Sequence, residues 1–296
     1  MTTLLHRFLR KASFTGMMFT AGATCAWADD TPTTSPPDKS GYTLFNPTPD
    51  ADMRSFSTDR PDKSTSPYTV DAGHFQYETD LLGGSYDGFN ASHTRTREFF
   101  TGDPVLKMGV TNFSDVEVAL GGYQNYQVKD RMANSTTNFD GFGDVTLRVK
   151  VNILGNDGGA VAIAIDPFYK IPTATRGLGN GVGEFGITVP AQVTLPCNFT
   201  ALFVTEFDDF KNVDNTGRHA GFTNLLNISH PITPKLTGAV EIWNQVQSTN
   251  MPTQYTLDLS LAYMLRPNTQ LDTATYIGLN KAAPDFVAYI GLSQRF

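Results

Sequence analysis

The chain has 296 residues, a formal net charge of −7 and 17% charged residues, against roughly 25% in an average soluble domain. This low charge, together with 21 phenylalanines, 11 tyrosines and 26 glycines, excludes a disordered acidic protein and does not suit a helical bundle. The negative balance also argues against a nucleic-acid-binding protein, which normally presents a basic surface. We therefore expect no nucleic-acid partner.

Residues 1–28 have the features of a secretory signal peptide. Three basic residues lie among positions 7–11, and the stretch 12–23 that follows carries no charge. Residues 26–28 (Ala-Trp-Ala) supply a small-x-small cleavage pattern, so we expect a cut after Ala28. A membrane anchor is the alternative, but the uncharged stretch is shorter than the roughly 20 residues that a spanning helix needs.

Two segments without regular periodicity follow the signal peptide. Residues 29–53 are rich in Pro and Thr, a composition typical of a flexible tail. Residues 54–73 are more specific and contain Asp59, Arg60 and Pro61. Our hypothesis is that this second segment folds into or against the mouth of the domain that follows, which we predict to be a barrel. It would act there as a plug, with Arg60 paired to carboxylates inside the barrel. The alternative is a disordered tether.

Residues 74–296 show period-2 alternation of apolar and polar residues, interrupted by Gly, Pro, Asn and Asp. Leu257, Leu259 and Leu261, for example, fall on one face of a strand, and Asp258 and Ser260 on the other. The pattern predicts about twelve strands, with 10 or 14 as alternatives. They lie near 74–82, 95–111, 115–127, 142–154, 159–171, 182–195, 199–210, 217–229, 235–247, 254–266, 270–280 and 284–296.

Two all-β architectures fit these strands: a soluble sandwich and a transmembrane antiparallel barrel. The predicted strands are longer than the roughly 5–6 residues usual in soluble sheets and match the ~9–11 residues of a membrane-spanning strand. Short and longer connections also alternate along most of the chain, as they do between the two ends of outer-membrane barrels. A sheet that faces lipid has to close, because unpaired backbone groups are too costly there. We therefore predict an outer-membrane β-barrel of a Gram-negative bacterium over 74–296.

The alternation also predicts which charged residues face the barrel lumen. A Lys or Arg on the lipid face near mid-membrane would cost about 2–4 kcal/mol, so we expect the charges of the strands to point inward. They can form a structural network that fills a narrow barrel, or a ring of charges that filters solutes. The predicted lumen-lining residues of the solute pathway are Glu78, Asp80, Lys107, Glu117, Arg148, Lys150, Glu206, Glu241, Asp258 and Asp272.

Several motifs resemble the family of outer-membrane barrels labelled for the MetA-pathway of phenol degradation, a set of transporter-like proteins. They are STDRPD at 57–62, GFGDVTLRVK at 141–150 and AYIGLSQRF at 288–296, in this order along residues 55–296. The terminal Phe296 resembles the C-terminal signal that the barrel insertion machinery reads, although Gln294 departs from the usual apolar choice two positions earlier. The resemblance implies passage of aromatic or other hydrophobic compounds across the outer membrane.

The sequence therefore predicts a passive outer-membrane channel for small, hydrophobic or aromatic solutes. Its expected partners are outer-membrane lipid and lipopolysaccharide, the insertion machinery and the solute; we predict no cofactor, no metal site and no catalytic residue. No Gly-x-Ser-x-Gly elbow occurs, which makes a barrel lipid-modifying enzyme the less favoured alternative. A structural or adhesive barrel with surface-binding loops is the main alternative. The aspartates within 140–144 and 208–209 leave calcium binding open.

Overall fold

The computed structural model describes residues 38–89, 93–212, 214, 216–249 and 251–296. The predicted signal peptide, with its cleavage site after Ala28, and the first part of the predicted tail lie outside these residues. Helix is confined in this part of the chain to two single turns, η1 (Asp50–Asp52) and η2 (Pro196–Asn198). No helix among the described residues is long and apolar enough to cross a membrane.

Antiparallel strands make up the rest of the regular structure. The first seven are β1 (Phe75–Asp87), β2 (Thr94–Thr101), β3 (Val105–Thr111), β4 (Ser114–Leu120), β5 (Tyr123–Asp130), β6 (Ser135–Phe142) and β7 (Val145–Leu154). The others are β8 (Val161–Ile171), β9 (Glu184–Thr194), β10 (Thr200–Lys211), β11 (Arg218–Thr233), β12 (Leu236–Gln247), β13 (Gln254–Arg266), β14 (Thr269–Gly278) and β15 (Phe286–Arg295).

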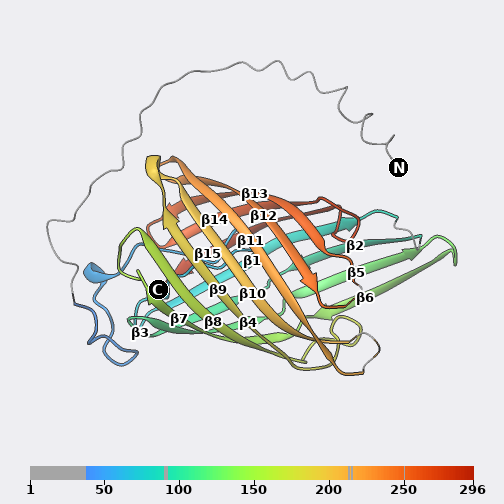
Figure 1. The fold of residues 1–296 in the computed structure, drawn as a ribbon, viewed down its shortest axis with the longest axis horizontal. Helices are drawn as coiled ribbons and strands as arrows, with labels where there is room; N and C mark the ends of the chain where they lie inside the picture. The colour runs from blue at the N-terminus through green and yellow to red at the C-terminus, as the bar shows by residue number, and fades with distance from the viewer. Residues whose placement is uncertain (1–37, 90–92, 213, 215, 250) are drawn as a thin grey trace, which may run out of the picture.

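These strands close into a twelve-stranded antiparallel barrel within the described part of the chain (Figure 1). Strands β7 to β15 follow one another around the wall, and β4 and β3 continue it to β1. The last strand then pairs with the first, from Gln76 opposite Arg295 to Tyr86 opposite Phe286. The predicted fold class is therefore confirmed, and closure leaves the wall of the barrel without a free edge.

The structure interrupts two of the predicted strands and replaces one predicted loop by a hairpin. The predicted strands 95–111 and 115–127 are each broken in two, at 102–104 and 121–122, and a third break at 143–144 separates β6 from β7. Glycines at the breaks explain this: a Cβ on Gly121 would lie 2.3 Å from the backbone of Gly143. The predicted loop 128–141 is instead a hairpin of β5 and β6 that extends beyond the barrel at the end that carries the longer loops (Figure 1).

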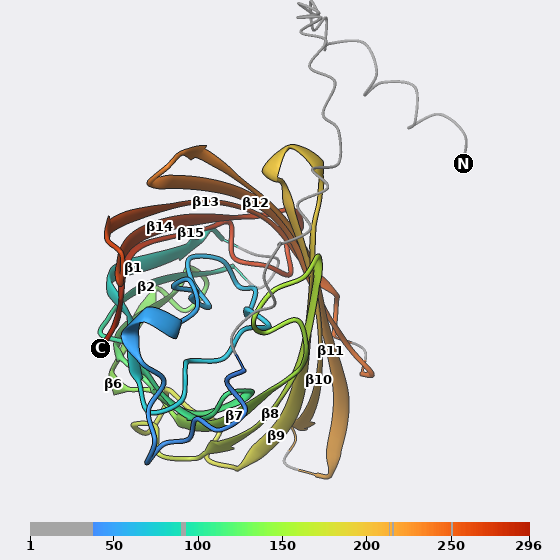
Figure 2. The same ribbon diagram turned by 90° about the vertical axis from the view of Figure 1, so that its left-hand side faces the viewer.

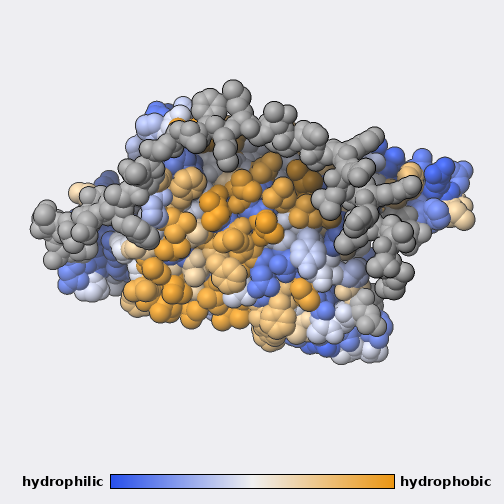
Figure 3. All heavy atoms as spheres, turned by 45° about the horizontal axis from the view of Figure 1, so that its top comes forward, coloured by the Kyte–Doolittle hydropathy of each residue, from blue (hydrophilic) through white to orange (hydrophobic). Residues whose placement is uncertain are grey.

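The two faces of the wall have opposite chemistry. Leu259 and Leu261 are exposed on the outside of β13 and Leu257 is partly exposed there, whereas Asp258 and Ser260 between them are buried on the lumen side. Figure 3 shows apolar residues over a broad area of the outer wall and hydrophilic residues towards the ends of the molecule. An apolar outside and a polar inside are the reverse of the arrangement in a soluble protein. This is the pattern expected where lipid, rather than water, surrounds the sheet.

Candidate functional site

The lumen contains the chain segment that precedes the first strand. We call residues 38–74 the lumenal segment; Figure 2 shows it inside the ring of strands, at the barrel end that carries the short turns and Phe296. At its end, the His74 ring lies between two backbone carbonyls, with Nε2 2.7 Å from that of Thr48 and Nδ1 3.1 Å from that of Phe296. The segment thus runs into the lumen and returns to the rim before β1 begins.

One side of the lumen wall carries cations. This cationic sector consists of Lys107 on β3 and of Arg148 and Lys150 on β7. Lys107 pairs with Glu78 at 2.7 Å and Lys150 with Glu117 at 3.0 Å, and all four side chains are almost completely buried. Alternation along neighbouring strands places these groups on one face, and the register of β4 against β7 brings Glu117 opposite Arg148.

Asp59 of the lumenal segment docks on this cationic sector. Its carboxylate accepts hydrogen bonds from the ammonium groups of both Lys107 and Lys150, the second at 2.7 Å. Its backbone N–H also donates to the Glu78 carboxylate at 3.1 Å. Burial acts to raise the pKa of Asp59, but the two ammonium groups outweigh it and hold the pKa well below its usual range. The charged carboxylate is therefore strongly stabilised when the segment is in place.

The adjoining part of the wall carries four carboxylates, which we call the acidic sector: Asp80 on β1, Glu241 on β12, Asp258 on β13 and Asp272 on β14. Among the described residues, the lysines and arginines within ion-pair distance of this sector come from the lumenal segment rather than from the wall. The segment thus presents its anion to the cationic sector and its cations to the acidic sector.

Arg60 occupies the first half of the acidic sector. Its guanidinium lies 2.7 Å from Asp80 and 3.0 Å from Asp272, and 4.8 Å from the ring centre of Tyr289. Both aspartates are direct cross-strand neighbours of Gly291 on β15: Asp80 on β1 at one side of that strand and Asp272 on β14 at the other. The guanidinium fills the space left by this glycine, because a Cβ there would lie 1.8 Å from Nη2.

Lys63 occupies the second half. Its ammonium donates to Asp258 at 2.9 Å and to the hydroxyl of Thr256 at 2.5 Å. It also lies 4.5 Å from the ring centre of Trp243 and 4.2 Å from that of Tyr276. Burial lowers the pKa of Lys63, and Asp258 opposes that shift. A positive charge is thus held between two rings and a carboxylate.

Further ion pairs fasten the segment at the short-turn end. Lys39 and Arg54 both bind Asp157, in the turn between β7 and β8, at 2.9 and 3.0 Å. Asp71 of the segment forms an ion pair with Arg295 of β15 at 3.2 Å. These contacts connect the segment to two further parts of the wall, the turn between β7 and β8 and strand β15.

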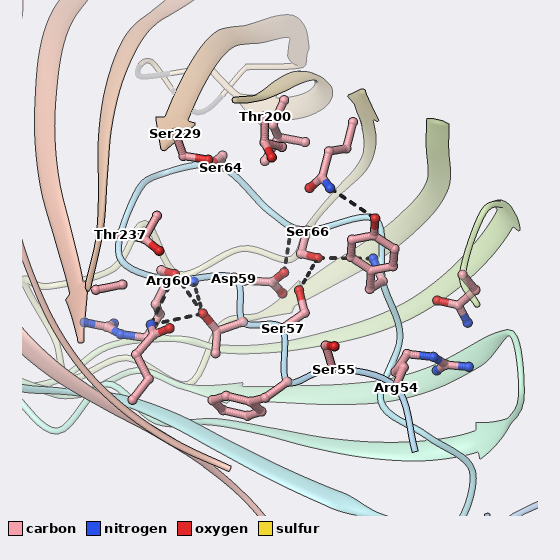
Figure 4. Close-up of a pocket in the computed structure, with 18 of the residues that line it drawn as sticks. Arg54, Ser55, Ser57, Asp59, Arg60, Ser64, Ser66, Thr200, Ser229 and Thr237 are labelled. Atoms are coloured by element: carbon pink, nitrogen blue, oxygen red, sulfur yellow. Dashed lines mark hydrogen bonds between the residues drawn. The ribbon is translucent and has the colours of Figure 1, made fainter. Parts of the chain in front are cut away.

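Two cavities flank the tip of the segment and share Asp59, Arg60 and Asp62 in their linings. The larger, about 800 Å³, lies towards the short turns. Hydroxyl groups from the segment and the wall point into it, among them Ser64, Ser66, Thr200, Ser229 and Thr237 (Figure 4). The smaller, about 240 Å³, lies towards the other end and is lined by Phe100, Tyr276 and Tyr289 as well as acidic groups. Residues 59–62 therefore stand between two spaces that lie along the lumen.

The structure places the predicted site residues as follows. Seven of the ten predicted lumen residues are buried in the interior: Glu78, Lys107, Glu117, Lys150, Glu241, Asp258 and Asp272. The other three are partly buried. Asp80 forms an ion pair with Arg60, and Arg148 forms one with Asp166 at 3.0 Å. The Glu206 carboxylate accepts a hydrogen bond from the Thr188 hydroxyl at 2.5 Å. The carbonyl of Pro61 accepts from the Tyr276 hydroxyl at 3.2 Å, and the Phe296 side chain is exposed.

Sequence reasoning missed several residues of this site. Asp115 and Asp166 are buried in the lumen, and the alternation that identified Glu117 already places Asp115 on the same face. Lys63 and Gly291 gave no comparable signal, since the first lies outside a strand and the second has no side chain. No group of three or more His, Cys, Asp or Glu side chains arranged to hold a metal ion occurs in the described ranges.

Comparison with known proteins gives a family and a fold. The family model described as "Putative MetA-pathway of phenol degradation" matches residues 58–296. No curated protein sequence matches the chain. Among solved structures, the COG4313 outer membrane channel from Pseudomonas putida F1 is 12% identical over 75% of this chain and 94% of its own, with a TM-score of 0.52. The NanC porin is 11% identical over 74% of this chain and 98% of its own, with a TM-score of 0.48.

Proposed function

This chain belongs to the phenol-degradation family whose model matches residues 58–296, and from that premise we propose that it is a passive outer-membrane channel for small aromatic or hydrophobic solutes. The proposal places it in the outer membrane of a Gram-negative bacterium after cleavage of a signal peptide at Ala28. Solutes move down their gradient, so neither a cofactor nor a catalytic residue takes part.

The observation that carries the proposal is the pair of cavities on either side of residues 59–62. A closed wall with an apolar exterior and a polar interior leaves the lumen as the route for a solute. The described structure has space on both sides of the tip of the lumenal segment, and that tip lies between the two spaces. Passage then requires residues 59–62 to shift, which makes the segment a plug.

The smaller cavity supports the aromatic part of the proposal. Phe100, Tyr276 and Tyr289 line it together with Val105 and Val287. Rings in such a cavity stack on an aromatic solute in offset or edge-to-face geometry, which contributes about 0.5–1.5 kcal/mol per pair beyond burial of area. The hydroxyl-rich larger cavity beyond the plug offers hydrogen bonds to a phenolic O–H group.

Deletion of residues 54–73 tests the role of the plug. Ion conductance of the purified protein in a planar bilayer should rise several-fold on deletion, because the ion pairs that hold residues 59–63 in the lumen are then absent. A deletion protein that still shifts on a gel between unheated and boiled samples, but conducts as the intact chain does, would reject the plug. The solute class is tested by comparing phenol with cyclohexanol. We expect phenol to reduce the ion current more, and equal effects would contradict an aromatic preference.

An adhesive barrel is the second candidate, and one observation favours it. The hairpin of β5 and β6 extends beyond the wall, and within the described residues β6 pairs with β5 alone. An exposed strand edge can pair with a strand of another protein. A barrel that stays silent in the bilayer, with and without residues 54–73, would favour this candidate over the channel.

A further inference from the structure

The acidic sector has the construction of a binding site for cations. Glu241 and Asp258 stand directly opposite each other on β12 and β13, and both are fully buried. Like charges in this position destabilise a sheet unless a cation lies between or beside them. Asp80 and Asp272 likewise flank Gly291. The wall thus holds four carboxylates in two pairs, and the positive charges that neutralise them come from another segment.

Aromatic rings complete both halves of the sector. Tyr289 lies over the guanidinium of Arg60, and Trp243 and Tyr276 lie over the ammonium of Lys63, all within 4.8 Å of the ring centres. The faces of such rings attract cations, most strongly where water is displaced. Carboxylates alone attract any cation, including Na⁺, whereas carboxylates combined with ring faces select organic cations that also present apolar surface.

The two halves differ in the shape of the cation that they accept. The first half is flat: Asp80 and Asp272 approach the guanidinium from two sides, and the missing side chain of Gly291 makes room for the planar group. Planar, forked donors are the ones that match two carboxylates. The second half, between Trp243, Tyr276 and Asp258, surrounds a compact ammonium.

Part of the second half lacks a partner even with Lys63 in place. Asp258 is fully buried, and its Oδ2 accepts from Lys63. Its Oδ1 is buried without a hydrogen-bond partner among the described residues. A buried carboxylate oxygen left in this way is costly, and a ligand with more N–H donors than one lysine ammonium can direct there would relieve that cost.

We propose that the acidic sector is a binding site for solutes that carry a guanidinium or primary ammonium group, and that Arg60 and Lys63 of the lumenal segment occupy it as internal ligands. A cationic solute and the segment then exclude each other from the same carboxylates. This inference rests on the proposed channel function and adds a class of solute that displaces the plug. Since a short tether gives a side chain an effective concentration in the millimolar range, the solute has to reach about millimolar levels to compete.

The second half can be tested through Trp243, because the chain has only two tryptophans and the other is Trp27. In a Trp27→Phe background of the full chain, Lys63→Ala vacates the site beside the indole. We expect ethylammonium chloride to change the Trp243 emission of this variant saturably, with a midpoint at millimolar concentration. Sodium chloride at equal ionic strength should leave it unchanged.

A matched variant separates specific binding from a general salt effect. Adding Asp258→Asn to the Lys63→Ala protein removes the carboxylate but keeps the rings, and should weaken ethylammonium binding at least about fivefold. Equal binding with and without this carboxylate, or an equal response to sodium, would overturn the proposal. The gel shift between unheated and boiled samples selects the preparations in which the barrel is folded.

The first half provides an independent test that does not need Lys63 variants. Arg60→Ala should raise the conductance in a planar bilayer, and methylguanidinium chloride should restore the lower value, whereas ethylammonium should be clearly less effective. Failure of methylguanidinium to act on a folded, conducting Arg60→Ala protein would overturn the proposal for this half. That result would leave the channel function standing, since the channel is judged by whether the barrel conducts at all, with and without residues 54–73.

Discussion

Arg60 and Gly291 fit each other so closely that no side chain can replace the hydrogen of the glycine. A Cβ on Gly291 would lie 1.8 Å from Nη2 of Arg60 and 2.5 Å from Cζ. The glycine belongs to the last strand of the barrel and the arginine to the segment before the first strand, so two parts of the chain that are distant in sequence meet in the lumen. The position of the lumenal segment is therefore built into the wall itself.

Gly291→Ala should displace Arg60 and weaken the closed state. An extra methyl group in a tightly packed site lowers the stability of the packed state by about 1–3 kcal/mol. We therefore expect a marked rise in the open fraction in bilayer recordings. The control is a double-mutant cycle with Arg60→Ala. If the glycine acts through the guanidinium, Gly291→Ala adds little once Arg60 is gone; full additivity would mean that it disturbs the barrel instead.

Asp59→Asn should loosen the plug on the cationic sector. Lys107 and Lys150 would each lose a charged partner but keep Glu78 and Glu117, so we expect the closed state to lose about 1–3 kcal/mol, or about 5- to 150-fold in its equilibrium. Asp50→Asn is the matched control, because Asp50 is exposed on η1 at the rim. Equal conductance of the two variants would contradict the role assigned to Asp59.

The closed state should also weaken in acid. Lys107 and Lys150 lower the pKa of Asp59 from its ordinary value of 3.8 when the plug is in place. A carboxylate with a lowered pKa contributes its full stabilisation above the ordinary value and loses it as the pH falls further. Conductance should therefore rise as the pH falls below about 4, and this acid-dependent rise should be smaller in Asp59→Asn. An identical pH profile in both proteins would speak against this mechanism.

The charge of Asp62 has the opposite effect on the closed state from that of Asp59. Burial raises the pKa of Asp62, and the nearby carboxylates of Asp258 and Asp272 add to the shift. A raised pKa means that the charged form of this carboxylate is disfavoured in the closed state relative to water, so its charge works against closure. Asp62→Asn should thus reduce opening at pH 7 in bilayer recordings; more frequent opening would show that the charge of Asp62 is needed for closure.

The lipid-facing side of the wall can be tested with a single charge. Leu259 lies in the middle of β13 and is exposed on the outer face. Leu259→Arg should lower the free energy of unfolding in lipid vesicles by about 2–4 kcal/mol, since an arginine near mid-membrane is costly. Met132→Arg, in the loop between β5 and β6, should leave it nearly unchanged. A Leu259→Arg protein as stable as the loop variant would place β13 outside the membrane.

Alternation along the chain predicted much of the barrel, because a strand with lipid on one side and a polar lumen on the other needs apolar and polar residues in turn. It identified the inward charges, including Glu117 and Asp258, without any knowledge of their partners. It did not identify the breaks at glycines such as Gly121, where the backbones of neighbouring strands approach closely. Close approach depends on register, and period-2 alternation does not reveal register.

The sequence by itself determined that this chain forms an outer-membrane barrel with charges inside, and it suggested that Arg60 meets carboxylates of the lumen. Only the tertiary structure decided which carboxylates these are. Asp80 and Asp272 lie 192 positions apart in the chain and face the same guanidinium because β1 and β14 both pair with β15. Strand closure and register create that proximity, and neither is a local property of the residues that it brings together.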